Sequence, residues 1–183
     1  MPRPLYPFET WQAVTSPPTL EQVPRRGWGG VFWNTHPTFT KRNWDRFAEI
    51  YEDTHGRALE PGEKRTLVRC VCVADTREEA MARVRPGHDE MWKFLGPYGW
   101  SKGYMGPDGK PAKAGLVPSL EESLEQKIWI VGSADEVGEQ IEWYRDLLGV
   151  ENLLLFPMMP GDSYKAGEEQ VHRLATDVLP KFG

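Results

Sequence analysis

Apolar residues in this chain alternate between short runs and longer stretches with helical spacing. The clearest example is a predicted helix followed by a predicted strand between residues 131 and 156. Ser133 and Glu136 have the spacing of a capping box at the start of this helix. Apolar positions then recur with a helical period: Val137, Ile141, Tyr144 and Leu148. Gly149 is expected to end this helix. The consecutive apolar residues 153–156 predict a strand buried on both faces, which is typical of parallel sheets.

Three earlier segments repeat the order of a strand followed by a helix. Strands are expected at residues 10–14, 29–33 and 65–74. Helices are expected near residues 16–26, 41–55 and 77–95, with a break at 86–87 in the third. A last helix near 163–179 should turn Val171, Leu174 and Val178 inward. Alternating strands and helices imply right-handed crossovers, so we expect an α/β fold with a parallel sheet of four strands.

Residues 96–126 interrupt this alternation. The segment is rich in glycine and proline, lacks clear periodicity, and ends in a polar helical piece near 120–125. A connection this long in a compact domain is usually a lid, an insertion or a disordered loop. A solvated flexible loop is therefore the alternative to a lid here.

Composition narrows the class of protein. The 183 residues suit one domain, and 22 basic against 27 acidic side chains give a net charge of −5, which argues against a general nucleic-acid binder. No apolar run reaches the length of a membrane span, and the first residues lack a signal-peptide core, so we expect a cytoplasmic protein. Cys70 and Cys72 should be reduced core residues, and no metal-binding cluster is visible.

Four segments together resemble the luciferase-like monooxygenases, the bacterial luciferase family of flavin and deazaflavin enzymes. They are WQAVTSP (11–17), RRGWGGVFW (25–33), VCVADTREEA (71–80), and VGSADEV (131–137) with GVENLLLFP (149–157). The family fold is a TIM barrel of eight βα units. The resemblance covers the last four units, strands five to eight. It implies one partial barrel domain over residues 1–183, with residues 96–126 as a lid-like insertion.

The resemblance implies a flavin-dependent monooxygenase that uses reduced flavin and O2 to oxidise a small organic substrate. FMN is the expected cofactor, a deazaflavin is the alternative, and a flavin reductase is a possible partner. Because the first four units have no counterpart here, the barrel would need a second copy or a separate N-terminal half. Whether the chain is an enzyme by itself therefore stays open. A non-catalytic subunit that dimerises into a barrel and a deazaflavin-dependent oxidoreductase are the competing interpretations.

Thr15 and Ser16 are the strongest candidates for cofactor binding. Hydroxyls beside free backbone N–H groups at a helix start can bind an anion. In the family, residues at the matching positions contact the flavin phosphate, and Gln12 lies on the same strand. The alternative is that Ser16 simply caps its helix.

The other candidates follow from their place at the ends of strands or in the insertion. Trp33 and Asn34 could contact a substrate, although packing in the core is the alternative for Trp33. His36 is a weak candidate for a catalytic proton donor. The lysines of the insertion could close on an anionic ligand: Lys102, Lys110 and Lys113. The remaining histidines, including His88, are expected at the surface.

Overall fold

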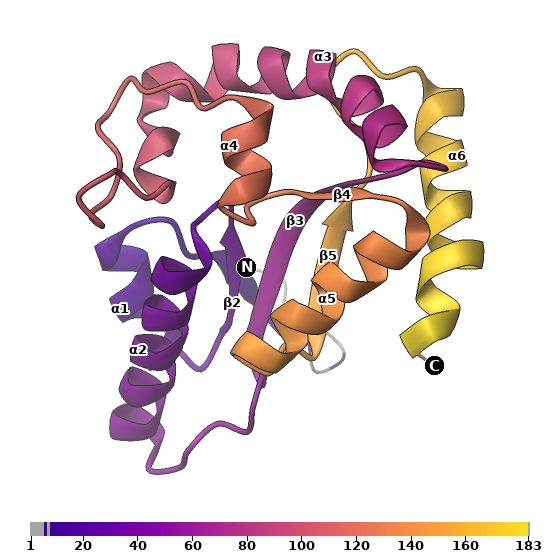
Figure 1. Ribbon diagram of the computed structural model, residues 1–183. Coiled ribbons are helices and arrows are strands. Elements are labelled where there is room, and N and C mark those ends of the chain that lie inside the picture. The colour runs from indigo at the N-terminus through magenta and orange to yellow at the C-terminus, as the bar shows by residue number, and fades with distance from the viewer. Residues whose placement is uncertain (1–5, 7, 183) are drawn as a thin grey trace.

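A computed structural model describes residue 6 and residues 8–182 (Figure 1). In this part of the chain, helices surround a sheet of five parallel strands. The strands are β1 (Trp11–Ala13), β2 (Gly29–Trp33), β3 (Arg65–Val73), β4 (Ile130–Gly132) and β5 (Asn152–Phe156). The α-helices are α1 (Pro17–Arg25), α2 (Pro37–His55), α3 (Arg77–Leu95), α4 (Leu120–Glu125), α5 (Ala134–Leu148) and α6 (Tyr164–Arg173). Shorter turns are η1 (Gly96–Tyr98), η2 (Trp100–Gly103), η3 (Leu174–Val178) and η4 (Leu179–Phe182).

The strand β3 is the centre of the sheet. β2 pairs along one side of it, and β1 pairs with β2. β5 pairs with residues 66–70 of β3 on the edge away from β2, and β4 pairs with residues 71–73, beyond the end of β2. Every pairing is parallel, so the predicted α/β class is confirmed. The short strand β4 was not predicted, because three residues are too few to show a pattern of their own.

Two buried clusters lie on the two faces of the sheet. One joins Phe32 and Leu67 to the helices α2 and α5. The other joins Cys70 and Cys72 to α3, α4 and the insertion, which lie over the upper ends of the strands in Figure 1. Both cysteines are buried and unbridged, as predicted. Burial raises the pKa of Cys70 to about 12, so its thiol stays protonated.

The prediction that β5 is buried on both faces was wrong. Leu153 and Leu155 pack against the cluster with α5, but Leu154 is 50% exposed and Phe156 is 45% exposed. The strand is therefore covered by helices on one face and open on the other. The prediction that Val171 points inward was also wrong, since it is 56% exposed.

The face of β5 that carries Leu154 continues across the sheet, where its middle is covered and Val68 is only 7% exposed. Register pairs Trp11 with Gly29, Trp33 with Val68, and Val68 with Leu154. Paired residues point to the same face of a sheet, and side chains alternate along each strand. Trp11 and Leu154 therefore mark two ends of one apolar face, on β1 and β5, and Trp11 is 36% exposed.

The helix α3 runs unbroken through Pro86, and no break occurs at residues 86–87. Gly87 instead allows a close approach, because a Cβ there would lie 2.3 Å from the Cβ of Met159. The insertion that follows is packed rather than loose. Its residues Ser101, Tyr104, Leu120 and Ser123 are fully buried, and α4 forms where the polar helical piece is predicted.

Candidate functional site

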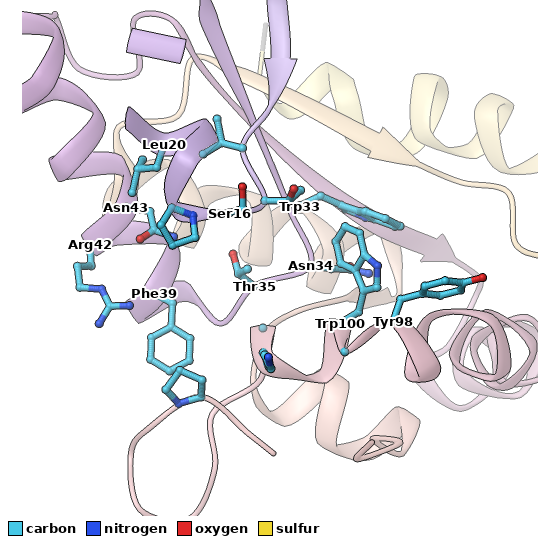
Figure 2. A pocket seen from close by; sticks show the side chains of 17 residues that line it. Ser16, Leu20, Trp33, Asn34, Thr35, Phe39, Arg42, Asn43, Tyr98 and Trp100 are labelled. Carbon is cyan, nitrogen blue, oxygen red and sulfur yellow. The ribbon is translucent and has the colours of Figure 1, made fainter. Parts of the chain in front are cut away.

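A cavity of about 530 Å³ lies at the carboxyl ends of β1 and β2. The start of α1, the first half of α2 and the insertion form its walls (Figure 2). Its volume falls within the range of about 300–1,000 Å³ typical of ligand sites. The predicted residues that line it are Thr15, Ser16, Trp33, Asn34 and Lys102. The cavity therefore brings together residues from three separate parts of the chain.

The backbone donors at the start of α1 are already engaged. Thr15 N and Ser16 N both donate to Thr19 Oγ1, at 3.2 and 3.1 Å. Thr19 N donates to Ser16 Oγ, and Pro17 and Pro18 have no N–H to offer. Free amides, on which the sequence argument for an anion site relied, are therefore absent from this helix start. Hydroxyl groups remain as the polar groups that face the cavity.

Two cationic side chains in the cavity wall can attract an anionic group, which the engaged amides of α1 cannot bind. Arg42 on α2 lines the cavity with its guanidinium 5.5 Å from the centre of the Phe39 ring, and Lys102 lines it from η2. Within residues 6 and 8–182, no salt bridge engages either side chain. Their positive charge is therefore available to an anionic ligand group. Arg42 was missed in the sequence, where it reads as one more residue on the polar face of a helix.

Aromatic side chains close the opposite side of the cavity. The rings of Trp33 and Trp100 meet edge to face with centroids 5.1 Å apart. Tyr98 and Asn34 also line the cavity, and Figure 2 draws both on the same side as the two tryptophans. Trp100 and Tyr98 were also missed, since the insertion lacks the periodicity that would give their side chains a direction.

His36 lies apart from this cavity. It lines a second cavity of about 470 Å³ with Lys41, Lys127 and Trp143. Its Nδ1 accepts a hydrogen bond from Thr38 N at 3.2 Å and so caps α2. Burial, and next the charge of Arg69, lower the pKa of His36 below its ordinary value. The imidazole is neutral at pH 7 and is not brought near Thr15 or Ser16.

Three other predicted residues lie outside the first cavity. Gln12 pairs with Gly30 in the middle of β1, on the opposite face from Trp11. Lys110 and Lys113 are exposed in the turn of the insertion. Lys102 is therefore the lysine of this set that the fold places against Ser16 and Asn34.

Arg69 holds the loop that carries the site. It is fully buried on β3, with Nε donating to Tyr144 Oη at 2.9 Å and one terminal nitrogen donating to the Thr35 carbonyl at 2.9 Å. Tyr144 in turn donates to the carbonyl of Lys127. These bonds fix the segment after β2, and with it Asn34, against the helical layer.

His88 is buried, and the prediction of a surface position was wrong. Its Nε2 lies 2.9 Å from Ser123 Oγ, and Tyr104 Oη lies 2.8 Å from the same oxygen. Ser123 also donates to the carbonyl of Ser119. The group Ser123, His88 and Asp89 resembles a catalytic triad in composition, but Ser123 is fully buried, so the network joins α3 to the insertion instead.

Acidic pH is expected to weaken the hydrogen-bonded contact between α3 and the insertion. Burial lowers the pKa of His88, an effect larger than the opposing contributions of Asp89 and Glu121; Arg85 adds to the lowering. The unfolded imidazole titrates near about 6.5, so the unfolded chain binds more protons below that pH. Stability should be complete above about pH 6.5 and should fall as pH drops toward 5. Urea unfolding at pH 7.5, 6.5 and 5.5 would measure the slope.

A matched pair of variants isolates His88. His88→Gln keeps a neutral hydrogen-bonding side chain and should reduce the slope between pH 6.5 and 5.5, while His36, whose pKa is also lowered by burial, retains its own contribution to the slope. His172→Gln removes an exposed histidine and should leave the slope of the parent chain. An equal slope in the parent and in His88→Gln would contradict the assignment.

Neither a metal site nor a membrane helix is found in the described part of the chain. No group of three or more His, Cys, Asp or Glu side chains there is placed to hold a metal ion. No helix within those residues is long and apolar enough to cross a membrane.

Comparison with known proteins identifies the family. A family model described as luciferase-like monooxygenase matches residues 1–151. The chain belongs to this family. The predicted resemblance to this family is thereby confirmed. No curated protein sequence matches the chain.

Solved structures of several other proteins share the fold. The oxygenating constituent of 3,6-diketocamphane monooxygenase from Pseudomonas putida, in complex with FMN, is 20% identical with a TM-score of 0.71. Monooxygenase RslO1 from Streptomyces bottropensis is 15% identical with a TM-score of 0.65. The coenzyme F420-dependent tetrahydromethanopterin reductase from Methanopyrus kandleri is 14% identical with a TM-score of 0.61. At these identities the likeness concerns the fold alone.

This luciferase-like chain spans about half the length of those structures. The three alignments include 93%, 96% and 94% of this chain. They include only 47%, 48% and 50% of the three solved chains. The α/β fold with a parallel sheet thus corresponds to about half of a TIM-barrel chain of the family.

Proposed function

We propose that this chain carries part of the cofactor site of a flavin-dependent monooxygenase that oxidises a small organic substrate. The observation that supports the proposal is the cavity at the carboxyl ends of β1 and β2, the edge of the sheet where barrel enzymes bind their ligands. We further propose that the four main βα units correspond to strands five to eight of the family barrel.

The residues of the cavity fit a flavin. Ser16 and Thr15 offer hydroxyls, and Arg42 and Lys102 offer positive charge for a phosphate. The aromatic side of the cavity suits a flat ring. A bound reduced flavin would supply the redox chemistry with O2, while the residues of this chain bind it, orient it and exclude water. No nucleophile is required from the protein.

Removing the hydroxyls tests the phosphate contact. Thr15→Ala with Ser16→Ala is expected to weaken FMN binding at least about 100-fold, because each of the two hydrogen bonds to a charged group contributes roughly 1.5–3 kcal/mol. Binding is measured by the quenching of flavin fluorescence on titration with the full chain.

The control must separate binding from helix capping, since Ser16 caps α1. Ser133→Ala removes the cap and capping box of α5, away from the cavity, and should leave FMN affinity unchanged. If the Thr15 and Ser16 double variant bound FMN as the parent does, the phosphate contact would be refuted.

The same titration separates FMN from a deazaflavin. One structural relative is described in complex with FMN and another as coenzyme F420-dependent. We propose FMN for this chain. Stronger binding of a 5-deazaflavin, read from its own absorbance, would favour the oxidoreductase alternative.

The open apolar face favours a second candidate, a subunit that completes a barrel with another copy of itself. β1 and β5 are both edge strands of the described sheet, and unpaired edges of a parallel sheet are rarely left to solvent. Two copies would together supply the length of the relatives, each of which is about twice as long as this chain. A twofold axis can place the β1 edge of each copy beside the β5 edge of the other copy. The purified chain should then show the native mass of a dimer by light scattering, and a stable monomer would refute this candidate.

A further inference from the structure

The side chain of Asn34 is buried without any hydrogen-bond partner. It is 1% exposed, and neither Oδ1 nor Nδ2 has a partner among the described residues. A buried carboxamide that is unpaired at both ends costs free energy, so such groups mark places where a ligand completes the bonding. The residue lines the cavity at the end of β2.

The backbone holds Asn34 in this position. Its φ angle of 51° lies in the left-handed region, which asparagine tolerates better than most residues. Arg69 fixes the next residue by donating to the Thr35 carbonyl at 2.9 Å. The direction of the side chain is therefore set by the fold and not by a partner of the amide.

The turn η2 packs against the backbone that carries Asn34. His36 N donates to the Gly103 carbonyl at 2.7 Å, and a Cβ on Gly103 would lie 2.3 Å from the Asn34 carbonyl oxygen. Trp100 from the same turn rests against Trp33. Because Asn34 is only 1% exposed, a ring can reach its amide only if part of the cavity wall moves, and Trp100 of η2 belongs to that wall.

A carboxamide presents a donor and an acceptor side by side. The matching ligand edge has an adjacent carbonyl and N–H, as in an imide or a lactam. The pyrimidine part of a flavin has such an edge, with the N3–H between two carbonyls. A phosphate alone would pair with Nδ2 and leave Oδ1 unsatisfied, so the amide suits the ring end of a ligand and not its anionic end.

We propose that Asn34 binds the imide edge of the flavin ring, with Trp100 displaced from Trp33 when the ring enters. The inference rests on the proposed flavin site and deepens it, since it assigns the ring end of the cofactor to a residue outside the phosphate contact.

The test compares FMN with FMN methylated at N3, which lacks the N3–H and carries a methyl group in its place. The full chain should bind FMN at least tenfold more tightly than the methylated analogue. Asn34→Gly, which keeps the left-handed backbone and removes the amide, should bind the two flavins equally. Asn152→Gly changes an exposed asparagine outside the cavity and should retain the parent preference.

The Asn34 side-chain NH2 signals give a second readout by NMR. They should shift on addition of FMN and stay in place on addition of inorganic phosphate. If the parent chain binds FMN but does not distinguish the two flavins, or if Asn34→Gly keeps the distinction, the inference is overturned and the flavin site stands. If the parent chain binds neither flavin at millimolar concentration, the proposed function falls, and the assignment of Asn34 falls with it.

Discussion

Replacing Arg69 with methionine is expected to lower the free energy of unfolding by about 2–4 kcal/mol. The change removes two guanidinium N–H donors, one bonded to the carbonyl oxygen of Thr35 and one to that of Val68. Arg69 is fully buried, so water cannot replace these donors. The Tyr144 hydroxyl would keep its bond to Lys127 but would lose the guanidinium beside it. Removal of a buried charge offsets part of this loss, which keeps the expected value below the sum of the lost bonds. Urea unfolding at pH 7 measures it.

Two further variants make the Arg69 result specific. Arg69→Lys keeps the charge but cannot reach several partners with a planar fork, so its stability should be intermediate. Arg25→Met removes an exposed arginine that pairs with Glu21 within one helix, and its effect should be small. If Arg25→Met and Arg69→Met lowered the free energy of unfolding equally, the buried hydrogen bonds of Arg69 would not contribute more to stability than an exposed ion pair.

Placing glutamate at Leu154 and Phe156 together is expected to abolish dimer formation. Both side chains are about half exposed in the single chain, so the monomer should tolerate the change. In a closed barrel both would be buried, and each apolar group lost costs roughly 1.5–3 kcal/mol before the penalty of burying a charge is added. The dimer affinity should fall at least about 100-fold. Light scattering across a concentration series measures it.

The matched control for this prediction is Val171→Glu. Val171 is as exposed as Leu154 but lies on α6, away from the open face. Its native mass should equal that of the parent chain. Loss of the dimer in both variants would point to a general effect of charge, and an unchanged dimer in the double variant would exclude the open face as the interface.

Local patterns were sufficient to predict most elements of the fold. The capping box at Ser133, the helix it begins and the stop at Gly149 all appear as the spacing indicates. Local energetics dominate at such positions, so the sequence reports them directly. The strand β5 shows the limit, because its four consecutive apolar residues look the same whether or not a layer covers the second face.

Part of the cavity lining was predicted from the sequence, and part was not, for a related reason. Thr15, Ser16 and Asn34 were found because polar residues at strand ends meet at one edge of a parallel sheet. The engagement of the α1 amides was missed because it depends on the rotamer of Thr19. The burial of His88 depends on how the insertion folds back over α3, and no local pattern encodes that contact.

The pairing of β3 with β5 has a consequence for the order in which the chain is made. Residues 66–70 of β3 pair with β5, which is synthesised after the insertion, α4, β4 and α5. Until β5 emerges from the ribosome, that stretch of backbone has an unpaired edge lined by apolar side chains. Such an edge can recruit strands from other chains. A chain cut before residue 152 is therefore expected to aggregate even though most of its helices are complete, so β5, the last of the five described strands, protects β3 during folding.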